Sequence, residues 1–165
     1  MSSANICSSM KTNFDICASP SAEATGPDRI LQIALTASNE GNFVEFVDHF
    51  SDGFTFTDHA LELEFKDKGR LIEFLAKIRE YFPDSETTAN TIYRSGERHI
   101  TEWTFKATHT EPFLGRSMRK VPICVAGISV VQIRNGKVIQ WSDYYDQLQS
   151  RRYSVAACFT EWIEA

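Results

Sequence analysis

Two aspartates are the strongest candidates for chemistry, because each shares a strand-like segment with regularly spaced aromatic residues. Asp58 ends the segment Phe54-Thr-Phe-Thr-Asp58, and Asp143 lies within Trp141-Ser-Asp-Tyr-Tyr145. Successive side chains of a strand point to opposite faces, so each aspartate is expected on the face that carries the larger rings. Burial beside apolar groups disfavours the carboxylate and raises its pKa toward neutral pH. Asp143 is therefore the main candidate for general acid–base catalysis and Asp58 the second, although either could instead cap a turn or pair with an arginine.

The same alternation predicts which other side chains share a pocket with these acids. In the segment 99–109, Trp103 and Phe105 alternate with charged residues, so their face is the drier one. On the last strand, Ile139 is expected on the same inward face as Asp143. The expected substrate-binding residues are Phe56, Trp103, Phe105, His109, Trp141 and Tyr145.

The histidines and cysteines do not have the spacing of metal ligands, so neither a metal nor a cofactor is expected. Alternation places His59 on the face opposite Asp58, whereas His49 and His99 are expected to be solvated. The cysteines are expected to be free thiols of a cytoplasmic protein. They are Cys7, Cys17, Cys124 and Cys158.

Composition and charge exclude two broad classes of function. The chain has 165 residues, a formal net charge of −5 and a pI of about 5.4. This balance argues against a nucleic-acid-binding protein, which needs a basic surface to neutralise phosphates. No apolar run approaches the roughly 20 residues that a membrane span requires. A small-molecule ligand is therefore the simplest expectation.

Local patterns predict helices in the first half of the chain and strands in the second. Helical spacing runs from Pro27 to Gly41, and further helices are expected at 42–50 and 67–82. Strands are expected at 54–58, 87–94, 99–109, 121–134 and 137–145, with a loop near 112–119 and a hairpin turn at Asn135-Gly136. Helices set against an antiparallel sheet define an α+β fold.

The domain organisation follows from the same patterns. Residues 1–26 lack a helical or strand period and are expected to form a disordered leader. Residues 27–165 are expected to form a single domain, in which 147–165 favours a terminal helix. A curved sheet closed by helices on one side would leave an apolar pocket.

Three stretches of this chain resemble the nuclear transport factor 2-like superfamily. They are FSDGFTFTD at 50–58, EWTFKATH at 102–109 and GISVVQIRNGKVIQWSDYYD at 127–146. The resemblance covers roughly residues 28–147 and is greatest to the SnoaL-like cyclases, the ketosteroid isomerases and the limonene-epoxide hydrolases. It implies a cone-shaped fold in which a curved, mostly antiparallel sheet and its helices close an apolar pocket.

Matching to the ketosteroid isomerases is partial. Asp58 occupies the place of their general base, eight residues after Phe50. Their oxyanion hole uses a tyrosine and a protonated aspartate, and those places hold Ala34 and Ser129 here. Steroid isomerisation by that route is therefore not expected, since such donors supply a large share of the rate enhancement.

This chain matches the SnoaL-like cyclases better than the limonene-epoxide hydrolases. Asp143 corresponds to one member of the Asp-Arg-Asp triad of limonene-epoxide hydrolases, but Trp103 and Phe105 stand in place of the other two. The SnoaL-like cyclases are similar in needing one aspartate that acts as both acid and base, and Asp143 matches that role. The apolar cavity then holds the substrate in a conformation that favours ring closure.

The first expectation is a cofactor-free SnoaL-like cyclase or isomerase acting on an apolar, oxygenated small molecule. Two alternatives stay open: a non-catalytic small-molecule-binding or dimeric scaffold module, and an epoxide hydrolase with a degenerate triad. A homodimer through the sheet face is also expected. An apolar outer face of the strand 121–134 would support it, formed by Cys124, Ala126, Ile128 and Val130.

Overall fold

The computed structural model describes residues 27–113 and 117–146. The helices are α2 (Pro27–Glu40), α3 (Phe43–Asp48) and α4 (Lys68–Tyr81). The strands are β1 (Phe50–Asp58), β2 (Leu63–Phe65), β3 (Glu86–Ser95), β4 (Arg98–Phe113), β5 (Ser117–Arg134) and β6 (Lys137–Tyr145). The predicted leader at 1–26 and the predicted terminal helix at 147–165 lie outside the described residues.

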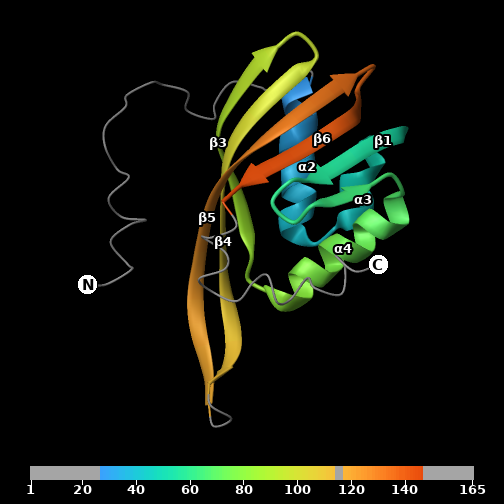
Figure 1. Ribbon diagram of the computed structural model, residues 1–165. Coiled ribbons are helices and arrows are strands. Elements are labelled where there is room, and N and C mark those ends of the chain that lie inside the picture. The colour runs from blue at the N-terminus through green and yellow to red at the C-terminus, as the bar shows by residue number, and fades with distance from the viewer. Residues whose placement is uncertain (1–26, 114–116, 147–165) are drawn as a thin grey trace, which may run out of the picture.

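The strands form one six-stranded sheet in the order β2-β1-β6-β5-β4-β3. All neighbours are antiparallel except β1 and β6, which run parallel and place Asp58 beside Asp143. The three helices lie against one side of the curved sheet, and the long β4–β5 arm extends beyond them (Figure 1). This arrangement confirms the predicted α+β fold with a mostly antiparallel sheet.

Cap and turn residues explain where α4 begins and where the chain turns between β5 and β6. Asp67 accepts a hydrogen bond from the Arg70 backbone N–H at 2.9 Å and so begins α4. Asn135 and Gly136 adopt φ of 51° and 73°, the left-handed conformation that a tight hairpin between β5 and β6 requires. These local signals are legible in the sequence, and the corresponding predictions are confirmed.

Other boundaries differ from prediction. The short second helix ends at Asp48, because Phe50 already pairs with Val138 of β6. Strand β2 was not predicted, since three residues are too few to show a period. The predicted loop near 112–119 is largely strand, with the β4–β5 ladder continuing to the pair Phe113 and Ser117.

The core lies between the sheet and the helices and is rich in aromatic rings. Phe50 stacks on Trp141 with ring centroids 6.0 Å apart, and Phe46 meets the same indole edge-on at 5.6 Å. Register shifts in the β5–β6 ladder beside Val138, which is fully buried. Ile139 therefore borders the opposite face with Gln140, and its predicted inward orientation is wrong.

Two further expectations also need correction. His99 is fully buried rather than solvated, because it belongs to the same inward-facing set of β4 as Thr101 and Trp103. Cys124 takes part in a disulfide, so the expectation of a free thiol is wrong for this residue. By contrast, His59 lies on the outer face as predicted, where its ring stacks on Tyr144 at 4.2 Å.

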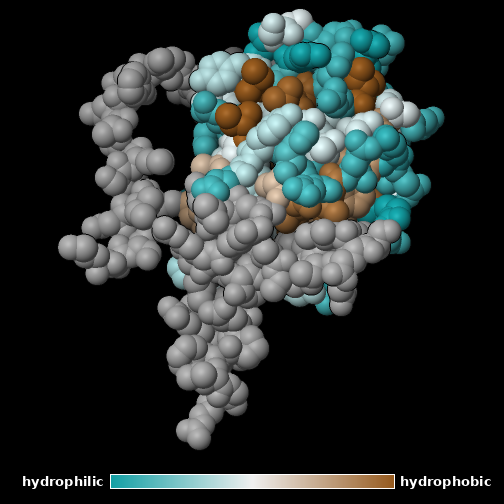
Figure 2. Space-filling view, in the orientation of Figure 1, coloured by the Kyte–Doolittle hydropathy of each residue, from teal (hydrophilic) through white to brown (hydrophobic). Residues whose placement is uncertain are grey.

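The surface of the described residues mixes polar and apolar groups (Figure 2). The large apolar side chains with the greatest exposure are Val44, Tyr93, Ile100, Ile128 and Tyr144. None of the helices in the described ranges has the length and apolar character needed to cross a membrane.

Candidate active site

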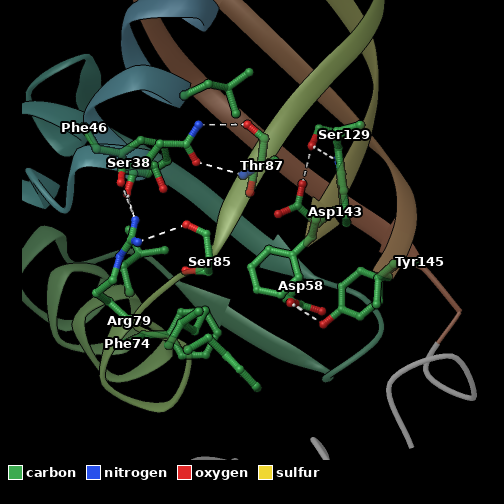
Figure 3. Close-up of a pocket in the computed structure, with 18 of the residues that line it drawn as sticks. Ser38, Phe46, Asp58, Phe74, Arg79, Ser85, Thr87, Ser129, Asp143 and Tyr145 are labelled. Carbon is green, nitrogen blue, oxygen red and sulfur yellow. Dashed lines mark hydrogen bonds between the residues drawn. The ribbon is translucent and has the colours of Figure 1, made fainter. Parts of the chain in front are cut away.

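A cavity of about 190 Å³ lies between the inner face of the sheet and the helices. Its wall is mostly apolar and includes Phe46, Phe56, Phe74, Trp103, Phe105 and Trp141. Asp58, Ser129, Asp143 and Tyr145 gather at the sheet side of this space (Figure 3). Strand pairing explains that gathering, since Asp143 is the register partner of both Asp58 on β1 and Ser129 on β5.

Asp143 is held by one of its two carboxylate oxygens. Oδ1 accepts a hydrogen bond from the Ser129 hydroxyl at 2.5 Å and another from the Trp141 indole N–H at 2.7 Å. Oδ2 accepts none from the part of the chain that the structure describes, and it points away from Ser129 (Figure 3). The half-buried side chain of Asp143 thus offers one oxygen to a ligand.

Asp58 is engaged through both of its carboxylate oxygens. Oδ1 accepts from the Leu61 backbone N–H at 2.9 Å, which closes a turn after β1. Oδ2 accepts from the Tyr145 hydroxyl at 3.0 Å. Asp58 is buried, and both contacts favour its ionised form. This carboxylate therefore serves the turn and the cavity wall together.

Burial raises the proton affinity of both aspartates. Burial raises the pKa of Asp143 to about 7; the Ser129 hydrogen bond opposes this shift, and the negative charge of Asp58 adds to it. Burial also raises the pKa of Asp58, against hydrogen bonds from Leu61 and Tyr145. Burial and the neighbouring Asp58 raise the pKa of Tyr145, so its hydroxyl stays protonated. Asp143 is therefore poised to change protonation near neutral pH.

The predicted site residues are largely brought together. Both candidate acids line the cavity, as do Phe56, Trp103, Phe105, Trp141 and Tyr145. His109 lies on β4 opposite Val121, and its side chain is outside the described residues.

Ser129 is the residue that sequence reasoning underrated. By the family resemblance it only replaces the protonated aspartate of the isomerases, yet it is almost fully buried and donates a hydrogen bond to Asp143. A single hydroxyl on the inward face of the apolar strand 121–134 was the signal that could have revealed it.

The helix side of the cavity carries polar groups whose hydrogen bonds go mostly to backbone. Arg79 donates to the carbonyls of Ser38, Asn39 and Ser85 at 2.6 to 2.9 Å. Its Nε has no partner among the described residues and is shielded from solvent. Asn39 exchanges two bonds of 2.8 Å with the backbone of Thr87. These groups tie α2, α4 and β3 together and so close that end of the cavity.

The arrangement defines a class of site: an apolar cavity with one accessible carboxyl group that titrates near neutral pH. Such a group can take a proton from a ligand and return it to another atom of the same ligand. The fold around it is the nuclear transport factor 2-like cone.

The family model of the SnoaL-like polyketide cyclases matches residues 28–152, so this chain belongs to that family. Comparison with curated protein sequences gave no match.

Solved structures with the same fold include several relatives of low sequence identity. IdmH of Streptomyces antibioticus, a candidate polyketide cyclase, is 15% identical with a TM-score of 0.68, covering 79% of this chain and 100% of IdmH. A candidate SnoaL-like cyclase of Shewanella putrefaciens is 12% identical with a TM-score of 0.68, covering 86% and 97% of the two chains. A protein of Catenulispora acidiphila with a ketosteroid isomerase-like fold is 19% identical with a TM-score of 0.63, covering 74% of this chain and 88% of that one. At these identities the likeness concerns the fold.

Proposed function

We propose that this protein is a cofactor-independent cyclase or isomerase in which Asp143 is the catalytic acid and base. The observation that carries the proposal is the state of Asp143. One oxygen is held by Ser129 and Trp141, the other faces the cavity, and its pKa is about 7. A pKa near the working pH keeps both protonation states populated, which a proton shuttle requires.

The cavity suggests the kind of substrate. Its volume of about 190 Å³ is somewhat larger than the roughly 150 Å³ cavity that encloses a benzene molecule. The Asp143 end offers an open carboxylate oxygen, whereas Asn39 bonds to the backbone of Thr87 and Arg79 keeps only Nε without a partner among the described residues. A compact apolar molecule of one or two rings, with a carbonyl or hydroxyl edge toward Asp143, fits this distribution.

The proposed reaction is an intramolecular aldol closure. The Asp143 carboxylate removes a proton from carbon next to a substrate carbonyl, and the resulting enolate attacks a second carbonyl of the same molecule. The protonated carboxyl group then returns that proton to the new alkoxide, so no co-reactant is consumed. The cavity wall holds the two carbonyl groups close together, which raises their effective concentration.

Among the described residues, the two positions that match the isomerase oxyanion hole offer no donor, and this limits the choice of substrate. Ala34 is buried in the core, and the Ser129 hydroxyl is engaged with Asp143, so neither acts as an enolate-stabilising donor. The Tyr145 hydroxyl donates to Asp58. The substrate must therefore have a C–H bond that is acidic without such donors, as the carbon between two carbonyl groups has.

The test is turnover by Asp143→Asn, which keeps the size of the side chain but cannot accept a proton. A panel of aryl-substituted diketones serves as the probe, with ring closure followed by absorbance and α-carbon exchange by NMR in deuterated water. We expect a loss of about 10²–10⁴-fold, the usual contribution of general acid–base catalysis. Affinity for a cyclic product analogue should be unchanged.

Asp52→Asn is the matched control, since Asp52 is fully exposed on β1 and away from the cavity. It should retain full turnover. Equal rates for Asp143→Asn and the parent protein would remove Asp143 from the mechanism, and binding without any turnover in the parent would favour a binding module instead.

The epoxide-hydrolase alternative receives no support from the site. The indole N–H of Trp103 donates to Ser129, and Phe105 has no polar atom with which to position water. The two positions that match the arginine and the second aspartate of the triad thus hold side chains that cannot supply those groups.

A further inference from the structure

We infer that Trp103 and Ser129 form a positioning relay that keeps the proton of Asp143 on Oδ2, the oxygen that faces the cavity. The inference rests on the proposed function only for its effect on turnover. The position of the proton on Asp143 follows from the hydrogen bonds alone.

The direction of the relay follows from what each group can donate. An indole N–H can only donate, so the bond of 2.8 Å from Trp103 to Ser129 Oγ occupies a lone pair of that hydroxyl. Ser129 has a single hydroxyl proton, which therefore lies on the 2.5 Å bond to Asp143 Oδ1. Trp141 donates to the same oxygen at 2.7 Å and cannot reverse its bond.

This pattern decides where an added proton goes. A proton on Oδ1 would face two donors, and Ser129 could accept it only by turning its own proton into a buried, apolar surrounding. A proton on Oδ2 disturbs none of these bonds. The catalytic proton therefore sits on the side of the ligand in every neutral Asp143.

Gly127 makes the relay sterically feasible. It is the register partner of Trp103 on β5, and a Cβ there would overlap Cζ2 and Cη2 of the indole ring. Without a side chain at this position, the ring lies across β5 and reaches Ser129 two residues further on. A glycine inside a strand often marks such a close approach.

The relay predicts a defined response of Asp143 to substitution. The Ser129 bond lowers the pKa of Asp143, so Ser129→Ala should raise it, by about one pH unit for a bond to a charged group. Trp103→Phe keeps a ring but removes the donor that polarises the Ser129 hydroxyl, so it should raise the pKa by less. Gly127→Ala should reproduce the Trp103→Phe shift.

The experiment is a titration of the Asp143 side-chain carboxyl carbon by NMR in the full chain, with Asp143→Asn used to assign the resonance. The double variant Trp103→Phe/Ser129→Ala should titrate like Ser129→Ala alone, since Trp103 acts through Ser129. Ser129→Thr keeps the hydroxyl, so the titration midpoint of Asp143 should stay at the parent value. Ser129→Ala should lower kcat while leaving KM unchanged.

Additive shifts in the double variant, or an unshifted midpoint in Ser129→Ala, would overturn the relay. The titration tests the relay whether or not Asp143 is catalytic, whereas the Asp143→Asn assay tests the proposed function. A shifted midpoint combined with an active Asp143→Asn variant would support the relay and overturn the function.

Discussion

At the residue scale, Asp143 combines an accessible oxygen with a proton affinity that its surroundings raise. Asp58 contributes to that affinity through its charge, while its own oxygens are taken up by Leu61 and Tyr145. The proposed function therefore gives the two carboxyl groups different tasks, the first chemical and the second electrostatic and structural.

Asp58→Asn separates these tasks. The charge of Asp58 raises the pKa of Asp143, so its removal should lower that pKa and move the corresponding limb of the pH–rate profile to lower pH. Turnover should persist, because the substituted side chain can still accept from the Leu61 N–H. Complete loss of turnover, with Asp143→Asn still active, would make Asp58 the catalytic base instead.

The raised pKa of Asp143 also predicts a pH-dependent stability cost. Its pKa is about 7 in the folded protein against a reference of 3.8, so the folded state holds this proton more tightly than the unfolded chain. The associated stability is present below pH 3.8 and is lost as the pH rises to about 7, at about 1.4 kcal/mol per pH unit.

Asp143→Asn lacks this term. Below pH 3.8 the melting temperature of this variant should match that of the parent protein. Between pH 3.8 and about 7 it should exceed the parent value by an amount that grows with pH, as measured by calorimetry at several pH values. A constant difference at all pH values would contradict the raised pKa.

At the element scale, α4 supplies one wall of the cavity through Phe74, Leu75 and Ile78. Its first turn depends on Asp67, whose carboxylate accepts from the Arg70 N–H. Asp67→Ala should lower the free energy of unfolding by about 1 kcal/mol, and Asp67→Asn by much less because asparagine is an equally good cap. Chemical denaturation measures both, and equal losses would show that the cap is not the cause.

The pairing of elements decides which side chains meet. The parallel β1–β6 pair sets Asp58 beside Asp143, and the antiparallel β5–β6 pair sets Ser129 there. Three strands thus converge on one group of polar atoms within an apolar wall.

At the scale of the whole molecule, the sheet face away from the helices carries a strip of exposed apolar side chains. Tyr93 pairs with Ile100 across β3 and β4, and Ile128 pairs with Tyr144 across β5 and β6. These four side chains are 40 to 53% exposed. We propose that a second copy of the chain covers this strip in a homodimer.

Ile128→Glu should therefore shift the protein from dimer to monomer in light scattering, since a charge would be buried in the interface. Val44→Glu is the control, because Val44 is 59% exposed on α3 at the helix side and should leave the mass unchanged. A monomeric parent protein would refute the dimer.

The sequence by itself was sufficient for features that depend on local geometry. Strand alternation placed Phe56, Trp103 and Trp141 on the cavity side, and cap and turn residues marked α4 and the β5–β6 hairpin. Such features follow from the direction of each Cβ and from hydrogen bonds between near neighbours, which a short segment settles alone.

Only the tertiary structure decided what depends on pairing between distant strands. The bulge that turns Ile139 outward and the reach of Trp103 across Gly127 to Ser129 both arise from register. Register is chosen by burial of the whole sheet against the helices, a global balance that no single strand encodes. For this reason the two aspartates could be singled out in advance, but the relay that orients Asp143 could not.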